Sequence, residues 1–159
     1  MAMVHQPYET MEGQGQQAVR QLSVFVTNQP GQLLRMTQVF ERKDIRILAL
    51  SVVDSADCAV VRLLVDLPEE ALKLLTDEGW AVSVSELVVV RLPHGKRGLL
   101  TVLSALLSSE VNIAYAYPLL PAQVGPAMAL HVDNIEIATD TLMRKGFQVL
   151  GEADLQSEG

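Results

Sequence analysis

The chain has 159 residues, 49% of them hydrophobic, and a formal net charge of −7 at pH 7. This balance argues against nucleic acid and against anionic membrane surfaces as partners, because phosphate groups are bound by clustered Lys and Arg. No apolar run reaches the ~18 residues of a membrane span, and no signal peptide is recognised before the first predicted strand. Cys58 is the only cysteine, so no intrachain disulfide is expected. These properties predict a cytoplasmic protein.

The sequence contains an internal duplication. Residues Val24, Leu33, Leu34 and Ile47 recur 66 positions later as Val90, Leu99, Leu100 and Ile113. Residues Leu63, Val65, Asp66, Glu69, Ala71, Leu75, Gly79 and Val82 recur 67 positions later, as Leu130 through Val149. Because these identities fall at core and capping positions, they predict two equivalent units, placed at 21–85 and 86–155 after a flexible arm at 1–20. Units this small bury only about 60% of the surface that the unfolded chain exposes, so we expect each unit to pack against the other or against a second chain.

In the first unit, alternating residues over 22–27 predict a strand, and helical spacing from Leu33 predicts a helix that Asp44 ends. Strands follow at 45–53 and 58–65, with a turn at 54–57 between them. Asp66 and Glu69 are expected to form a capping box at the start of the second helix, and Gly79 ends that helix. A fourth strand is expected over 80–84.

The second unit repeats this order, with strands at 87–92, 111–117, 127–132 and 147–150 and helices at 99–108 and from 133 to 145. Each unit is therefore β-α-β-β-α-β. With right-handed crossovers this order gives a four-stranded antiparallel sheet with two helices on one face. We thus predict the α+β class, with two ferredoxin-like domains.

The alternation of side chains along the strands separates the two faces of each predicted sheet. The helix-facing set of the first unit comprises Val24, Val26, Ile47, Ala49, Val61, Leu63 and Val65. The opposite face comprises Phe25, Leu48, Leu50, Val52, Val60 and Leu64, which is too apolar to face water and indicates an interface. In the second unit this face carries Ala114, Ala116, Ala127, Ala129 and His131. We expect a homodimer to cover the apolar face, with packing of the two units on each other as the alternative.

The segment Asn28-Gln29-Pro30-Gly31 lies between a predicted strand and a predicted helix. Proline restricts φ, glycine allows close approach of the backbone, and a helix N-terminus presents free amides and the positive end of its dipole. Such a loop can hold a small carboxylate. The same turn is also typical of an ordinary helix start without any ligand, which is the more common case.

The β-α-β-β-α-β order, the sequence Asn28-x-Pro30-Gly31-x-Leu33 and the Asn112-Ile113 strand start resemble the ACT domain family, whose small regulatory modules bind amino acids between paired modules. The arrangement is similar to stand-alone tandem ACT proteins, which carry no catalytic domain. The resemblance covers residues 21–150. It implies a ligand site formed by Asn28, Gln29, Pro30, Gly31, Gln32 and Leu33, faced by Asn112 of a neighbouring module. Arg46 occupies the position in the first unit that corresponds to Asn112, as an additional carboxylate partner or a solvated residue.

The loop of the second unit, His94-Gly95-Lys96-Arg97-Gly98, departs from this pattern because it lacks the Pro-Gly step. His94 is either a ligand contact or, more often at such a position, a solvated loop residue. We therefore expect one good site per chain and a modified second one.

The predicted function is a non-catalytic regulator that binds a small amino acid and acts with a second copy and a metabolic enzyme or transporter. No catalytic residue, metal or cofactor is expected, because no nucleophile-base pair appears. One alternative is a metal-dependent enzyme or resistance protein of the vicinal-oxygen-chelate type, since the segment 129–134 around His131 resembles part of that family. Against it, Leu64 stands where the first unit would need a matching histidine. The other alternative is a purely structural dimerisation module.

Overall fold

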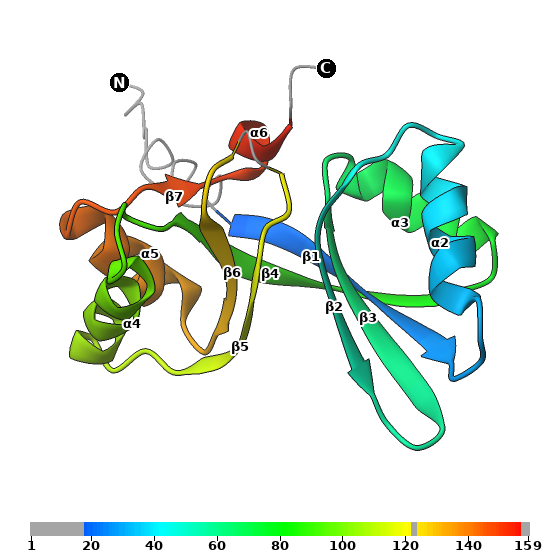
Figure 1. Ribbon diagram of the computed structural model, residues 1–159, viewed down its shortest axis with the longest axis horizontal. Coiled ribbons are helices and arrows are strands. Elements are labelled where there is room, and N and C mark those ends of the chain that lie inside the picture. Colours follow the sequence, from blue (N-terminus) through cyan, green and yellow to red (C-terminus); the bar gives the residue numbers. More distant parts are fainter. Residues whose placement is uncertain (1–17, 122–123, 157–159) are drawn as a thin grey trace, which may run out of the picture.

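A single strand, β4 (Ala81–Arg91), runs through both halves of the molecule (Figure 1). The computed structural model describes residues 18–121 and 124–156. The first half contains β1 (Ala18–Thr27), α2 (Gln32–Glu41), β2 (Ile47–Asp54), β3 (Cys58–Val65) and α3 (Pro68–Asp77). The second half contains α4 (Gly98–Ser108), β5 (Ile113–Pro118), β6 (Ala127–Val132), α5 (Ile135–Arg144), β7 (Val149–Leu150) and α6 (Glu152–Leu155).

The strands form one seven-stranded antiparallel sheet in the order β2-β3-β1-β4-β6-β5, with β7 paired to β4. Residues 81–88 of β4 pair with β1, and residues 88–91 pair with β6 and β7. Each half thus keeps the ferredoxin-like order, but the prediction of two separate four-stranded sheets is wrong. The strands expected at 80–84 and 87–92 are one strand because Ser85 and Glu86 between them are neither glycine nor proline and do not break it.

The first strand begins at Ala18, so residues 18–20 of the arm expected at 1–20 belong to the sheet. The rest of that arm, residues 1–17, lies outside the described residues.

Each half carries a register irregularity at the same place, between Ile47 and Ala49 in β2 and between Ile113 and Tyr115 in β5. A bulge adds one residue on one strand, so every later side chain changes face. The predicted faces are therefore wrong beyond each bulge, in ways that the strand pairing defines. In β2, Ala49 lies on the outer face with Leu64, whereas Leu50 and Val52 pair with Leu63 and Val61 on the helix side. In β5, Tyr115 and Tyr117 lie on the outer face where Ala116 was expected.

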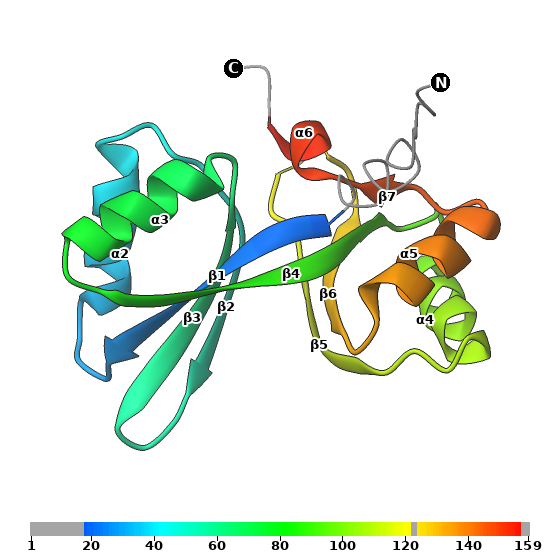
Figure 2. The same cartoon turned by 180° about the vertical axis from the view of Figure 1, so that it is seen from behind.

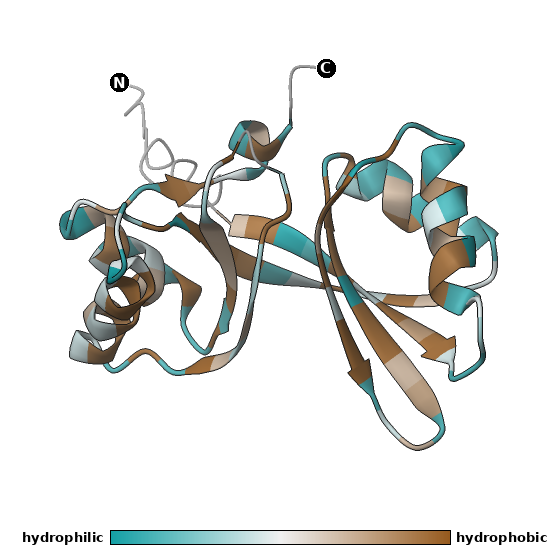
Figure 3. Ribbon diagram, viewed as in Figure 1, coloured by the Kyte–Doolittle hydropathy of each residue, from teal (hydrophilic) through white to brown (hydrophobic). Residues whose placement is uncertain are grey.

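Three apolar cores result. One lies between the sheet and α2 and α3, another between the sheet and α4 and α5, and the middle core lies between the two outer sheet faces. The pair α2 and α3 and the pair α4 and α5 consequently cover opposite ends of the molecule, as Figures 1 and 2 both show. Figure 3 shows that β2 and β3, the strands of the first half beside the middle core, are mostly hydrophobic.

The middle core covers part of the apolar face that we expected a homodimer to cover. Leu48 and Leu64 are 1% and 0% exposed because Tyr117, Ala129 and their neighbours of the second half pack on them. The contact extends to the backbone, since the Leu120 N–H donates to the Leu48 carbonyl at 2.7 Å. Phe25, farther along the same face, remains 45% exposed.

A polar cluster is embedded in the middle core. The fully buried Gln21 amide donates through Nε2 to the Tyr115 hydroxyl at 2.7 Å and accepts at Oε1 from the Tyr117 hydroxyl at 2.6 Å. The Arg62 guanidinium lies 3.9 Å from the centre of the Tyr115 ring. Burial, and after it the neighbouring Tyr115, raises the pKa of Tyr117 well above its usual range, so the phenol remains a donor. One glutamine on β1 thereby connects the two halves.

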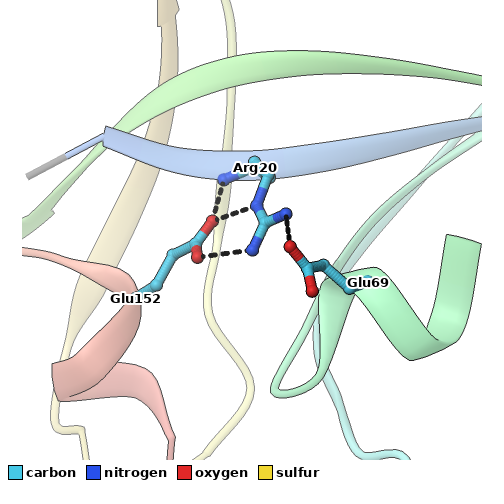
Figure 4. Close-up of polar contacts among 3 residues, drawn as sticks. All are labelled: Arg20, Glu69 and Glu152. Atoms are coloured by element: carbon cyan, nitrogen blue, oxygen red, sulfur yellow. Dashed lines mark hydrogen bonds and ion pairs between the residues drawn. The ribbon is translucent and has the colours of Figure 1, made fainter. Parts of the chain in front are cut away.

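An ion-pair cluster connects the same strand to two helices (Figure 4). The Arg20 Nε lies 2.8 Å from Glu152 Oε1 on α6, and its Nη1 lies 3.3 Å from Glu69 Oε1 on α3. The Arg20 backbone N–H also donates to Glu152 at 3.0 Å. The Glu69 side chain is 83% exposed, so the Glu152 contact accounts for most of the stabilisation. Hydrogen bonding from Arg20 lowers the pKa of Glu152.

Gln21→Ala is expected to lower the free energy of unfolding by about 2–3 kcal/mol, because it leaves two tyrosine hydroxyls in a buried site without their partner. Urea denaturation at neutral pH measures this loss. The control is Ser83→Ala on the same sheet, an exposed position that should change stability by less than about 0.5 kcal/mol. Equal stabilities of the Gln21 and Ser83 variants would contradict a structural role for the cluster.

Glu152→Gln is expected to cost about 1–2 kcal/mol at pH 7, less than a fully buried charged hydrogen bond because the pair is partly solvated. The folded-state pKa of Glu152 is lowered from its ordinary value of 4.5, so its contribution is complete above that pH and disappears as the pH falls through the lower value. Urea denaturation from pH 7 to pH 3 should show the wild-type advantage shrinking below about pH 4.5. Glu69→Gln is the exposed control, and an advantage that does not change with pH would contradict the assignment.

Candidate functional site

Among the described residues, no side chain caps the backbone amides at the start of α2. Gly31 occupies the N-cap with φ 86°, a left-handed conformation, and it offers no side-chain acceptor. The preceding turn is closed by the Gln29 N–H, which donates to the Thr27 carbonyl at 2.8 Å. At the start of α5, in contrast, Asn134 Oδ1 accepts from the Ile137 N–H at 3.0 Å. The positive end of the α2 dipole is therefore open to an anion from solvent.

The residues expected at this site surround that helix start. Asn28, Gln29, Pro30, Gly31 and Leu33 are exposed, and Gln32 is half-buried. The Asn28 Nδ2 donates to Asp54 Oδ1 at 3.1 Å, which holds the loop against the end of β2. The Asn28 Oδ1 stays available as an acceptor.

Asn112 does not meet this loop within one chain. It is exposed and immediately precedes β5 in the half that contains α4 and α5, whereas the loop follows β1 in the half that contains α2 and α3 (Figures 1 and 2). A site that combines Asn28 with Asn112 therefore requires a second copy of the chain.

Asn112 and Arg46 are held by a contact that occurs in both halves. The Arg46 N–H donates to Asp66 Oδ1 at 2.8 Å, and the Asn112 N–H donates to Asp133 Oδ1 at 3.1 Å. The predicted capping box of α3 is wrong, because the Asp66 carboxylate is bound to the start of β2 and no side chain in the described part of the chain caps that helix. The Arg46 N–H at the start of β2 binds the Asp66 carboxylate in place of the α3 amides.

Arg46 lies at the opposite end of β2 from Asn28. Asn28 contacts Asp54, the last residue of β2, and Arg46 precedes its first residue. The eight residues of β2, at ~3.3 Å each, separate the two positions by roughly 25 Å. The structure therefore does not bring Arg46 to the loop of its own half. Arg46 instead lines a cavity of about 520 Å³ at the end of α2, together with Asp44 and Asp66. The sequence alone did not predict this cavity.

In the loop of the second half, His94 is exposed. The loop ends at Gly98, which packs closely against the backbone of Pro93. A Cβ added at Gly98 would lie 2.3 Å from the Pro93 carbonyl oxygen, so no larger residue fits at the start of α4. This loop is built for close packing of its own backbone.

His131 lies on β6 with its ring stacked on Tyr115, the ring centres 4.7 Å apart. Its Nδ1 is buried without a hydrogen-bond partner among the described atoms. Over residues 18–121 and 124–156, no group of three His, Cys, Asp or Glu side chains is placed to hold a metal ion. The contact that the structure shows for this histidine is the stacking on Tyr115, whose ring borders the middle core. In the same part of the chain no helix is long and apolar enough to cross a membrane.

Comparison with known proteins confirms the predicted resemblance. The family described as ACT domain pair matches residues 17–158. The crystal structure of protein BT0572 from Bacteroides thetaiotaomicron superposes with a TM-score of 0.82 at 28% identity, covering 89% of this chain and 97% of that one. The ligand-free regulatory subunit of aspartate kinase from Thermus thermophilus gives a TM-score of 0.57 at 17% identity, covering 79% and 89%. No curated protein matches the chain.

Gly31→Ala is expected to lower the free energy of unfolding by about 1–2 kcal/mol, because an L-residue pays that amount for the left-handed conformation. No atom of residues 18–121 or 124–156 lies within 4 Å of the added Cβ, so the cost is conformational and not steric. Gly31→Asn should lose less, since asparagine tolerates this region. Urea denaturation compares both with Gln29→Ala, and equal stability of all three would contradict the strained turn.

Proposed function

This chain belongs to the ACT domain pair family, and on that basis we propose that it is a regulatory protein, without catalysis of its own, that binds a small amino acid between paired modules. The regulatory subunit of aspartate kinase from Thermus thermophilus, which shares the fold, is itself named as a regulatory chain. By the same logic we propose a metabolic enzyme or transporter of the cytoplasm as the regulated partner.

The uncapped start of α2 is the observation that supports this site best. The carboxylate of the amino acid binds the backbone amides of Gly31 to Leu33, where the helix dipole favours a negative group. The ammonium group donates to the side-chain oxygens of Asn28 and of Asn112 from a second copy. An amide side chain suits a zwitterion because it offers both a donor and an acceptor.

Exposed leucines support the participation of a second copy. Leu33 and Leu34 beside the loop are 38% and 62% exposed, and α4, which contains no charged residue, exposes Leu103 and Leu107 by 38% and 75%. The α4 helix ends four residues before Asn112. Packing of the α2 leucines of one copy against α4 of the other would therefore remove apolar surface from water and bring Asn112 toward the loop.

Asn28→Ala and Asn112→Ala are each expected to weaken amino-acid binding about 10- to 150-fold, the effect of losing one charge-assisted hydrogen bond. A thermal-shift screen of the common amino acids identifies the ligand, and calorimetry then measures the dissociation constant. Gln38→Ala, an exposed change on the same helix, is the control and should bind as wild type.

An unchanged dissociation constant in both asparagine variants would place the site elsewhere. If no amino acid produces a thermal shift and the chain is a dimer by light scattering, the dimerisation module becomes the better explanation.

A further inference from the structure

We propose that two copies of the ligand-free chain associate through α4, with the helix of one copy packed antiparallel on the same helix of the other. Helix α4 lies at one end of the molecule (Figure 1), and several of its leucines are exposed. Three features select a second copy as the partner. They are the spacing of these leucines, the charges at the two ends of the helix and the comparison with α2.

The exposed side of α4 is a continuous apolar stripe. Leu100, Leu103 and Leu107 are 53%, 38% and 75% exposed, and their spacing places them on one side of the helix. The other side, with Val102 and Leu106, is buried in the core of the second half. The helix contains no charged residue. A surface helix normally turns polar residues to water, so this stripe indicates a packing partner.

The first half shows that the fold does not need these leucines. Helix α2 occupies the equivalent place 66 positions earlier and packs on its own sheet in the same way. Yet Thr37 and Glu41 of α2 stand where α4 has Leu103 and Leu107. Because the same helix forms with polar residues at these two positions, the leucines serve a purpose other than folding.

The charges at the ends of α4 oppose the dipole of their own helix. Lys96 and Arg97 precede the first turn, and Glu110 follows the last. A helix is stabilised by the opposite arrangement, with acidic residues at its start and basic residues at its end. In the part of the chain that the structure describes, the Arg97 guanidinium and the Glu110 carboxylate form no ion pair or hydrogen bond. Both residues are exposed and therefore available to a partner.

An antiparallel second copy matches both the stripe and the charges. With a twofold axis at the middle of α4, Leu100 and Leu107 are equally far from the axis, so each meets the other across the contact. Arg97 and Glu110 are also equally far from it, so two ion pairs form between the copies. A parallel pair would bring like charges together. The charges therefore select the antiparallel arrangement.

One consequence rests on the function proposed above. The contact proposed there buries the same α4 leucines against α2 of a second copy, and one helix cannot form both contacts at once. An amino acid that binds between Asn28 and Asn112 stabilises the α2 contact and so draws copies away from the α4 pair. Ligand binding is thereby converted into an exchange of partner surfaces.

Analytical ultracentrifugation of the full chain without amino acids tests the α4 contact. The wild type should form a concentration-dependent dimer. Leu107→Gln should weaken it at least about 10-fold, because the contact contains this leucine twice. Val53→Gln removes an exposed apolar side chain of the first half and should leave the dimer unchanged.

Charge reversal tests the orientation. Arg97→Glu and Glu110→Arg should each weaken the dimer by about 5- to 10-fold, and the double variant should restore it. Each single change also suits the dipole of α4, so the isolated monomer should be at least as stable as wild type. Urea denaturation of dilute protein checks this stability and separates a weakened contact from a loss of folding.

Three results would overturn the proposal. They are a monomer up to millimolar concentration, a double variant that dimerises no better than the single variants, or an effect of Leu34→Gln as large as that of Leu107→Gln, which would place α2 in the ligand-free contact. Asn28→Ala should leave this ligand-free dimer intact while it weakens amino-acid binding, so failure of the α4 contact and failure of the proposed function are separable.

Discussion

The continuity of β4 is the constraint on which the rest of the architecture depends. Because the last strand of the first half is also the first strand of the second, no flexible linker separates the two ACT modules. The twist of the shared sheet turns its two outer faces toward each other. The apolar side chains of the two faces pack together and are removed from water. Gln21 makes this contact specific, because its amide can form both hydrogen bonds only when the Tyr115 and Tyr117 hydroxyls are in their observed positions.

The two halves of the duplication share their backbone features and differ in the side chains at the ends of their helices and strands. The bulges in β2 and β5, the Asp66 and Asp133 contacts and the left-handed residues Asp44 and Glu110 occupy equivalent places. The first half retains an open helix start and a charged cavity. The second half has a tightly packed loop at Gly98 and an uncharged helix with exposed leucines. The two halves therefore share one backbone framework and differ in the side chains that they expose at its ends.

Local patterns were sufficient for much of the fold. Hydrophobic periodicity located the helices after Pro30 and Pro68 and the hairpin around residues 54–57, because apolar spacing directly reflects which face meets a core. It failed at positions such as Ala49 and Tyr115, where one extra residue in a strand reverses the faces. The pairing partner decides where a bulge forms, and a single segment contains no information about its partner.

The sequence by itself determined the two-fold repeat, the family and the loop at Asn28 to Leu33, because these depend on residue types at short spacing. Only the tertiary structure decided that β4 is shared, that the apolar face is partly covered within the chain and that Arg46 lies a strand's length from Asn28. It also brought Glu41, Arg46 and Asp66 around one cavity. Such groupings depend on how distant segments pack, and packing is a property of the whole chain.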